Sequence, residues 1–88
     1  MKVLIVDDEP LARQRAARLL QELGGIELVG EAANAEQALA EIERLQPDAL
    51  LLDIAMPGIS GIDLAQQLAE RESSPAIVFC TAYDEYAL

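Results

Sequence analysis

Short, continuous apolar runs separated by amphipathic stretches are the feature of this sequence that most constrains its fold. The runs occupy residues 3–6, 49–52 and 76–80, and their apolar side chains are consecutive rather than alternating. Strands of this kind are typical of parallel sheets that are covered by helices on both faces. A fourth candidate strand, residues 27–32, mixes polar and apolar side chains, which fits a half-exposed edge strand.

Three intervening segments, residues 11–23, 35–45 and about 62–71, have the spacing of amphipathic helices. Residues 84–88 are expected to begin a further helix. Strands and helices therefore alternate along the chain, which predicts an α/β fold with a doubly wound parallel sheet. In such sheets the functional crevice lies beyond the carboxyl ends of the strands.

The first helix is predicted to have one apolar face and one polar face. Pro10 suits its first turn and Gly24-Gly25 its end, just as Asn34 suits the N-cap of the next helix. Arg13, Arg15 and Arg18 are interpreted as part of a solvated face. The residues that fall on its apolar face are Ala12, Ala16, Leu19, Leu20 and Leu23.

Composition limits the classes of function that the chain can have. Its 88 residues support one small domain, and 16 acidic against 6 basic residues give a net charge of −10. That charge disfavours direct contact with nucleic acids or anionic membranes, but it suits a divalent cation. No apolar run approaches the roughly 18 residues of a membrane-spanning helix, and Cys80 has no cysteine to pair with. We therefore expect a soluble, cytoplasmic domain.

Acidic side chains follow two of the apolar runs. Asp7 and Asp8 come directly after the first strand, Asp53 ends the third, and Thr81 follows the fourth. If the first and third strands are neighbours, the three carboxylates converge at one rim of the sheet and repel one another. An oxygen-preferring ion such as Mg2+ relieves that repulsion, and an aspartate beside it can attack phosphorus. A hydroxyl at Thr81 could then bind a phosphoryl oxygen.

The segments VLIVDDE (residues 3–9), LLDIAMPG (51–58) and Thr81-Ala82 resemble the receiver domains of two-component response regulators. Residues 7–13 and 79–88 narrow the resemblance to the LytR/AlgR group, whose receivers usually precede a LytTR DNA-binding domain. The joint spacing, 45 residues from Asp8 to Asp53 and 28 from Asp53 to Thr81, is far more specific than any single motif.

The resemblance implies a role for each matching residue. Asp53 would accept a phosphoryl group from a sensor histidine kinase. Mg2+ would be held by Asp8 directly, by Asp7 largely through water, by Asp53 and by the backbone carbonyl of Ala55. It implies also that Thr81 is the switch hydroxyl and that the small Ala82 leaves access to the phosphoryl site. DNA would be contacted only by an output domain absent from this chain.

The same resemblance implies a flavodoxin-like receiver fold with strand order 2-1-3-4-5, of which residues 1–88 would lack the fifth strand and the fifth helix. The lysine that usually ends the fifth strand is missing, and Lys2 lies at the wrong end of the sheet to replace it. We therefore expect crippled phosphotransfer in this chain, whether or not Mg2+ binds. An open edge at residues 76–80 could support a homodimer or exchange of elements.

Two other functions remain open at this point. A phosphatase with an aspartyl-phosphate intermediate commonly has a second aspartate two residues after its nucleophile, and here that position is Ala55. Ala55 argues against turnover of external substrates, so we expect the domain to catalyse only its own phosphorylation and dephosphorylation. A phosphorylation-independent interaction module is the other alternative, and specific Mg2+ binding would argue against it.

Overall fold

Four strands and three helices alternate along the part of the chain that the computed structural model describes, residues 1–53, 60–71 and 74–80. In chain order the elements are β1 (Lys2–Val6), α1 (Pro10–Leu23), β2 (Glu27–Ala32), α2 (Ala35–Leu45), β3 (Ala49–Asp53), α3 (Gly61–Ala69) and β4 (Ala76–Cys80). The four strands and three helices predicted before residue 81 are all present, with β1, β3 and α1 each extended by one residue.

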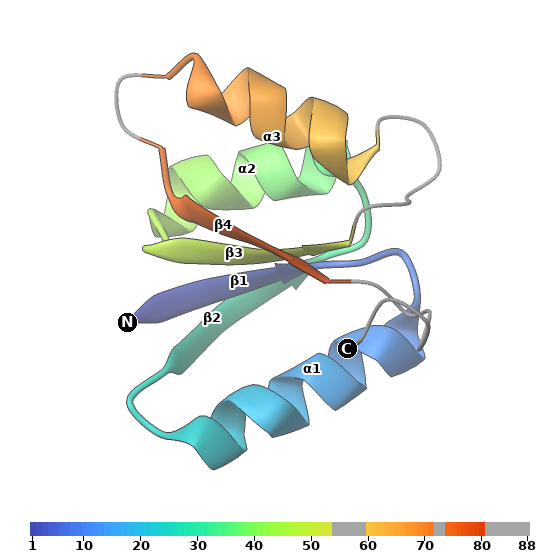
Figure 1. Ribbon diagram of the computed structural model, residues 1–88, viewed down its shortest axis with the longest axis vertical. Coiled ribbons are helices and arrows are strands. Elements are labelled where there is room, and N and C mark those ends of the chain that lie inside the picture. Colours follow the sequence, from blue (N-terminus) through green and yellow to red (C-terminus); the bar gives the residue numbers. More distant parts are fainter. Residues whose placement is uncertain (54–59, 72–73, 81–88) are drawn as a thin grey trace.

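All the strand pairs are parallel, and the sheet has the order β2-β1-β3-β4. Helices α2 and α3 cover one face and α1 covers the other (Figure 1). The doubly wound sheet predicted from the sequence is thereby confirmed, and β2 is the predicted edge strand. Residues 84–88, where a further helix was predicted, lie outside the described residues.

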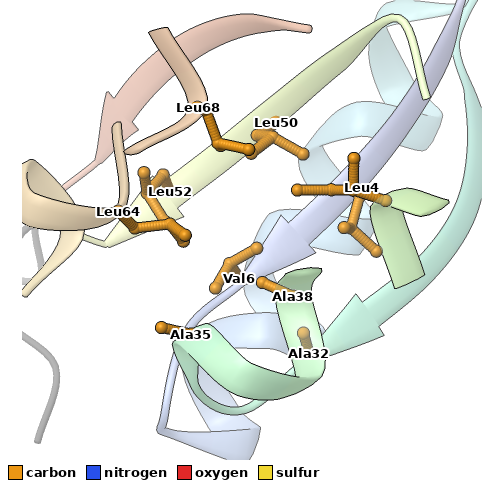
Figure 2. Close-up of a cluster of buried hydrophobic side chains, with 10 residues drawn as sticks. Leu4, Val6, Ala32, Ala35, Ala38, Leu50, Leu52, Leu64 and Leu68 are labelled. Atoms are coloured by element: carbon orange, nitrogen blue, oxygen red, sulfur yellow. The ribbon is translucent and has the colours of Figure 1, made fainter. Parts of the chain in front are cut away.

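The hydrophobic core lies between the sheet and the α2/α3 layer (Figure 2). Because side chains alternate along a strand, every second residue of β1 and β3 points into this layer. Val3 and Ile5 are also buried, and their positions in β1 direct them to the α1 face. The core cluster consists of Leu4, Val6, Ala32, Ala35, Ala38, Ile42, Leu50, Leu52, Leu64 and Leu68.

Local signals set the helix ends. The side chain of Asn34 caps α2 by accepting a hydrogen bond from the backbone N–H of Gln37 at 2.8 Å, as predicted. Helix α1 begins at Pro10 and ends at Leu23, and the capping residue that follows, Gly24, has a φ of 71° that a residue with a side chain would rarely adopt. Helix α3 runs from Gly61 to Ala69 instead of 62–71, because the Ser60 hydroxyl caps it one residue earlier than predicted.

The α1 layer is thinner than its sequence pattern predicted. No residue of α1 is buried, and Leu19 and Leu23 are 60% and 72% exposed. The two leucines belong to the apolar face predicted for α1, but most of their surface remains exposed. An apolar stripe on a helix reveals which side chains share a face, but not whether another element covers all of that face.

Strand β2 contains a bulge that decides which of its side chains face α1. Val3 pairs with Leu28 and Leu4 with Gly30, so Val29 is the extra residue. After the bulge, Gly30 and Ala32 lie on the α2 face, and Glu31 between them lies on the α1 face. A Cβ at Gly30 would come within 2.9 Å of Leu45 Cδ1, so α2 packs directly on this glycine.

Gly30→Val is expected to lower the free energy of unfolding by about 1–3 kcal/mol, because Leu45 and Leu4 would have to move aside. Urea unfolding followed by circular dichroism measures the change. Glu27→Val, at an exposed position of the same strand, is the matched control and should stay within about 0.5 kcal/mol of the wild type. Equal unfolding midpoints for the two variants would contradict the packing argument.

Within the described residues, β4 pairs only with β3, and its Val78 and Phe79 are 55% and 43% exposed. This agrees with the open edge predicted for residues 76–80; association through that edge stays a prediction.

None of the helices in the described ranges has the length and apolarity needed to cross a lipid bilayer.

Candidate metal and phosphoryl site

Three carboxylates meet at the carboxyl ends of β1 and β3. Strand pairing places Val6 beside Leu52, which brings the following residues, Asp7 and Asp53, level with each other. Asp7, Asp8 and Asp53 each offer a carboxylate oxygen, and these oxygens all lie within 4.8 Å of one another. The predicted convergence of the first-strand pair with Asp53 is confirmed.

The chemistry of this donor set suits a hard divalent cation. Negative charges at such distances repel one another, and a cation between them converts the repulsion into attraction. Mg2+ prefers oxygen ligands and retains several waters, so a cluster at an open rim leaves room for a phosphate oxygen. Asp7 is only 9% exposed, whereas Asp8 and Asp53 are half-buried at the rim. The cluster could therefore bind a metal ion while remaining accessible to a phosphodonor.

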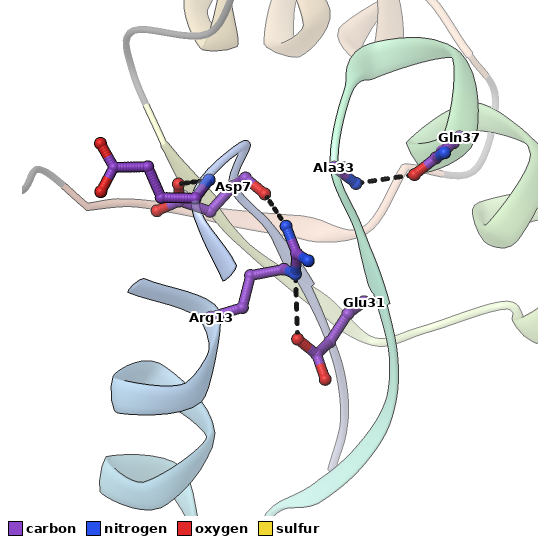
Figure 3. Close-up of polar contacts among 6 residues, drawn as sticks. Asp7, Arg13, Glu31, Ala33 and Gln37 are labelled. Atoms are coloured by element: carbon purple, nitrogen blue, oxygen red, sulfur yellow. Dashed lines mark hydrogen bonds and ion pairs between the residues drawn. The ribbon is translucent and has the colours of Figure 1, made fainter. Parts of the chain in front are cut away.

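Asp7 is fixed by hydrogen bonds on three sides. Its backbone N–H donates to the carbonyl of Ala32 at 3.0 Å, and its Oδ1 accepts from the backbone N–H of Glu9 at 3.0 Å. Its carbonyl oxygen accepts from Arg13 Nη1 at 2.7 Å (Figure 3). The turn that joins β1 to α1 thus has a single defined course through the acidic cluster.

Arg13 is the residue that sequence reasoning misplaced. It was interpreted as part of a solvated helix face together with Arg15 and Arg18, but its side chain is only 19% exposed and reaches over the rim. Besides the Asp7 carbonyl, it contacts Glu31 of β2, with 3.1 Å between Nε and the carboxylate (Figure 3). Arg15 and Arg18 are exposed, as that interpretation requires.

A positional signal could have identified Arg13. It lies in the fourth position of a helix that starts two residues after the Asp7-Asp8 pair, so its long side chain is within reach of the strand end. Helical periodicity alone cannot reveal this contact, because the acceptor is a backbone carbonyl and carries no signature in the sequence.

Three predicted site residues cannot be placed. Ala55, Thr81 and Ala82 lie outside the described residues. The carbonyl ligand, the switch hydroxyl and the small residue beside the phosphoryl site therefore stay predictions from the resemblance.

Comparison with known proteins agrees with the fold. A family model described as "Response regulator receiver domain" matches residues 3–88. The chain belongs to the family of response regulator receiver domains.

Several relatives are similar over the whole chain. The "Positive alginate biosynthesis regulatory protein" of Pseudomonas aeruginosa is 56% identical over 89 residues, which cover 100% of this chain and 36% of that protein. The "Transcriptional regulatory protein BtsR" of Escherichia coli K12 is 52% identical over 88 residues, again 100% of this chain and 36% of the relative. The chain thus spans little more than a third of the length of these curated relatives.

A solved structure supports the same assignment. The response regulatory domain of protein mrkE from Klebsiella pneumoniae superimposes with a TM-score of 0.84 at 38% identity. The match covers 99% of this chain and 71% of that one. The predicted receiver fold is confirmed for the elements present here.

Proposed function

We propose that this domain is a phosphorylation-operated switch in which Asp53 accepts a phosphoryl group from a sensor histidine kinase. The observation that carries the proposal is the cluster of carboxylate oxygens from Asp7, Asp8 and Asp53 within 4.8 Å of one another. Membership of the receiver family supports the same chemistry. A carboxylate nucleophile beside a cation site is what acyl phosphate formation requires.

The transfer step moves a phosphoryl group from a phosphohistidine nitrogen to Asp53. An Asp53 carboxylate oxygen forms a bond to phosphorus while the bond from phosphorus to the phosphohistidine nitrogen breaks, and the departing imidazole takes up a proton. Mg2+, when bound, neutralises the phosphoryl oxygens. We assign Asp8 and Asp53 as carboxylate ligands of this ion, Asp7 as a ligand largely through water, and the Ala55 carbonyl as a further protein donor.

The modified state would differ from the unmodified state through contacts that only the phosphoryl group can make. Thr81 is proposed to donate its hydroxyl to a phosphoryl oxygen, and Ala82 to leave the approach open. A contact made in one state only shifts the equilibrium between two conformations by its differential free energy. Catalysis by the domain would be confined to its own phosphorylation and dephosphorylation.

The output is proposed to be transcriptional and to lie in another domain. One relative is described as a transcriptional regulatory protein, and the family resemblance points to a LytTR-type DNA-binding partner. This segment has a net charge of −10, so contact with DNA falls to that partner. The proposal places the domain in the cytoplasm, where a single cysteine stays reduced.

Mg2+ binding is the direct test of the acidic site. Titration calorimetry is expected to show one Mg2+ bound per chain, and Asp8→Asn should weaken the affinity at least about tenfold by removing a ligand. Glu22→Gln removes an equal charge from an exposed position near the far end of α1 and should leave the affinity unchanged.

Two results would count against this proposal. Equal losses of affinity in the two variants would mean that Mg2+ responds to overall charge and not to the cluster. The absence of saturable binding in the wild type would favour the interaction module that retains an acidic pocket without using it.

A further inference from the structure

We propose that Arg13 is a positioning residue that fixes the peptide unit between Asp7 and Asp8, and through it the geometry of the cation site. This inference rests on the proposed Mg2+ site. The Arg13 guanidinium donates from Nη1 to the Asp7 carbonyl at 2.7 Å and from Nε to Glu31 at 3.1 Å. One side chain thereby joins α1, the end of β1 and the edge strand β2 (Figure 3).

The carbonyl that Arg13 holds belongs to the peptide linking the two adjacent acidic residues. Rotation of this peptide would swing the Asp8 backbone relative to Asp7 and separate their carboxylates. The Asp7 N–H and side chain are held by Ala32 and Glu9, and Arg13 adds a restraint on the carbonyl. Groups that hold metal ligands in place commonly determine a large part of a site's affinity.

Glu31 holds the guanidinium from the other side. The bulge in β2 puts Gly30 and Ala32 on the α2 face, which leaves Glu31 on the α1 face beneath Arg13. Binding two acceptors costs arginine little conformational entropy per hydrogen bond, because its planar guanidinium holds the donors in a fixed geometry. The negative charge of Glu31 also offsets the positive charge of Arg13 locally, so the acidic cluster keeps most of its attraction for a cation.

The charge of Arg13 and its hydrogen bonds have opposite expected effects on Mg2+. If only charge mattered, removing this cation near three carboxylates would tighten Mg2+ binding, most strongly at low salt. If positioning dominates, the same removal weakens binding at every salt concentration. The sign of the change in affinity therefore separates the two explanations.

Arg13→Met, which keeps the apolar stem and removes the donors, is expected to weaken Mg2+ binding about tenfold in calorimetric titrations at both low and high salt. Arg13→Lys restores one donor and should lose only about threefold, which also provides the test if the Met variant does not fold. Arg18→Met, on an exposed position of the same helix, is the control and should bind as the wild type does. Unchanged or tighter binding by Arg13→Met would overturn the proposal.

A second readout needs no metal. The Glu9 amide donates to the Asp7 side chain, so loss of the Arg13 restraint should accelerate its hydrogen exchange in Mg2+-free protein, as observed by NMR. Unchanged exchange at Glu9 would refute the positioning role. A wild type that fails to bind Mg2+ would refute the proposed function, yet the exchange measurement would still decide whether Arg13 orders this turn.

Discussion

Asp53→Asn is expected to abolish phosphoryl incorporation in the intact protein. Wild-type protein incubated with Mg2+ and a phosphorylated histidine kinase, or with acetyl phosphate, should gain at most one phosphoryl group per chain, as measured by intact mass. The yield should be low, because the lysine that usually ends the fifth strand is missing from these 88 residues. The amide of asparagine keeps the shape of the side chain but is no nucleophile, so the variant should remain at the background of protein kept without a phosphodonor.

Asp48→Asn is the matched control, because Asp48 precedes the first residue of β3 and Asp53 is its last. It lies at the opposite end of the sheet from the acidic cluster and should be labelled like the wild type. Persistent labelling of Asp53→Asn would show that another residue accepts the group. Hydrolysis of a generic phosphate ester over many turnovers, in place of one group per chain, would identify a phosphatase and not a switch.

Leu4→Ala is expected to lower the free energy of unfolding by about 2–5 kcal/mol. Leu4 is fully buried in β1, which lies between β2 and β3, and it contributes to the core cluster beneath α2 and α3. Small domains have only about 5–15 kcal/mol of total stability, so the loss is a large fraction of what holds the sheet together.

The change is measured by urea denaturation, with Leu11→Ala as the control. Leu11 is 67% exposed in the first turn of α1, so its truncation should alter stability by about 0.5 kcal/mol or less. Similar unfolding midpoints for the two variants would mean that the α2/α3 layer is not the main source of stability.

Patterns along the chain were sufficient to predict the strands and the rim of the sheet. The continuous runs before Asp7 and Asp53 indicated buried parallel strands, and adjacency of those strands was enough to predict the meeting of the carboxylates. These predictions succeed because the hydrophobicity and charge of each side chain can be read from the sequence, and because the carboxyl ends of parallel strands lie at one edge of the sheet.

Other features depend on partners that a sequence does not display. The exposure of Leu19 and Leu23 depends on what packs against α1, and their spacing carries no information about that. Arg13 was assigned to solvent because it is charged, whereas its main acceptor is a backbone carbonyl. Helix α3 begins one residue earlier than predicted, because the Ser60 side chain caps it. In this helix Leu64 is buried and Ala69 is exposed.

The unequal thickness of the two helical layers has a thermodynamic consequence. Helix α1 has no buried residue, so detaching it from the sheet requires less free energy than disrupting the α2/α3 side. Such a sub-global opening breaks the Arg13 bonds and releases the turn at Asp7, while leaving the leucine core intact. If the acidic cluster binds a cation as proposed, the bound ion favours the closed arrangement, so a higher free cation concentration increases the fraction of molecules in which α1 is docked.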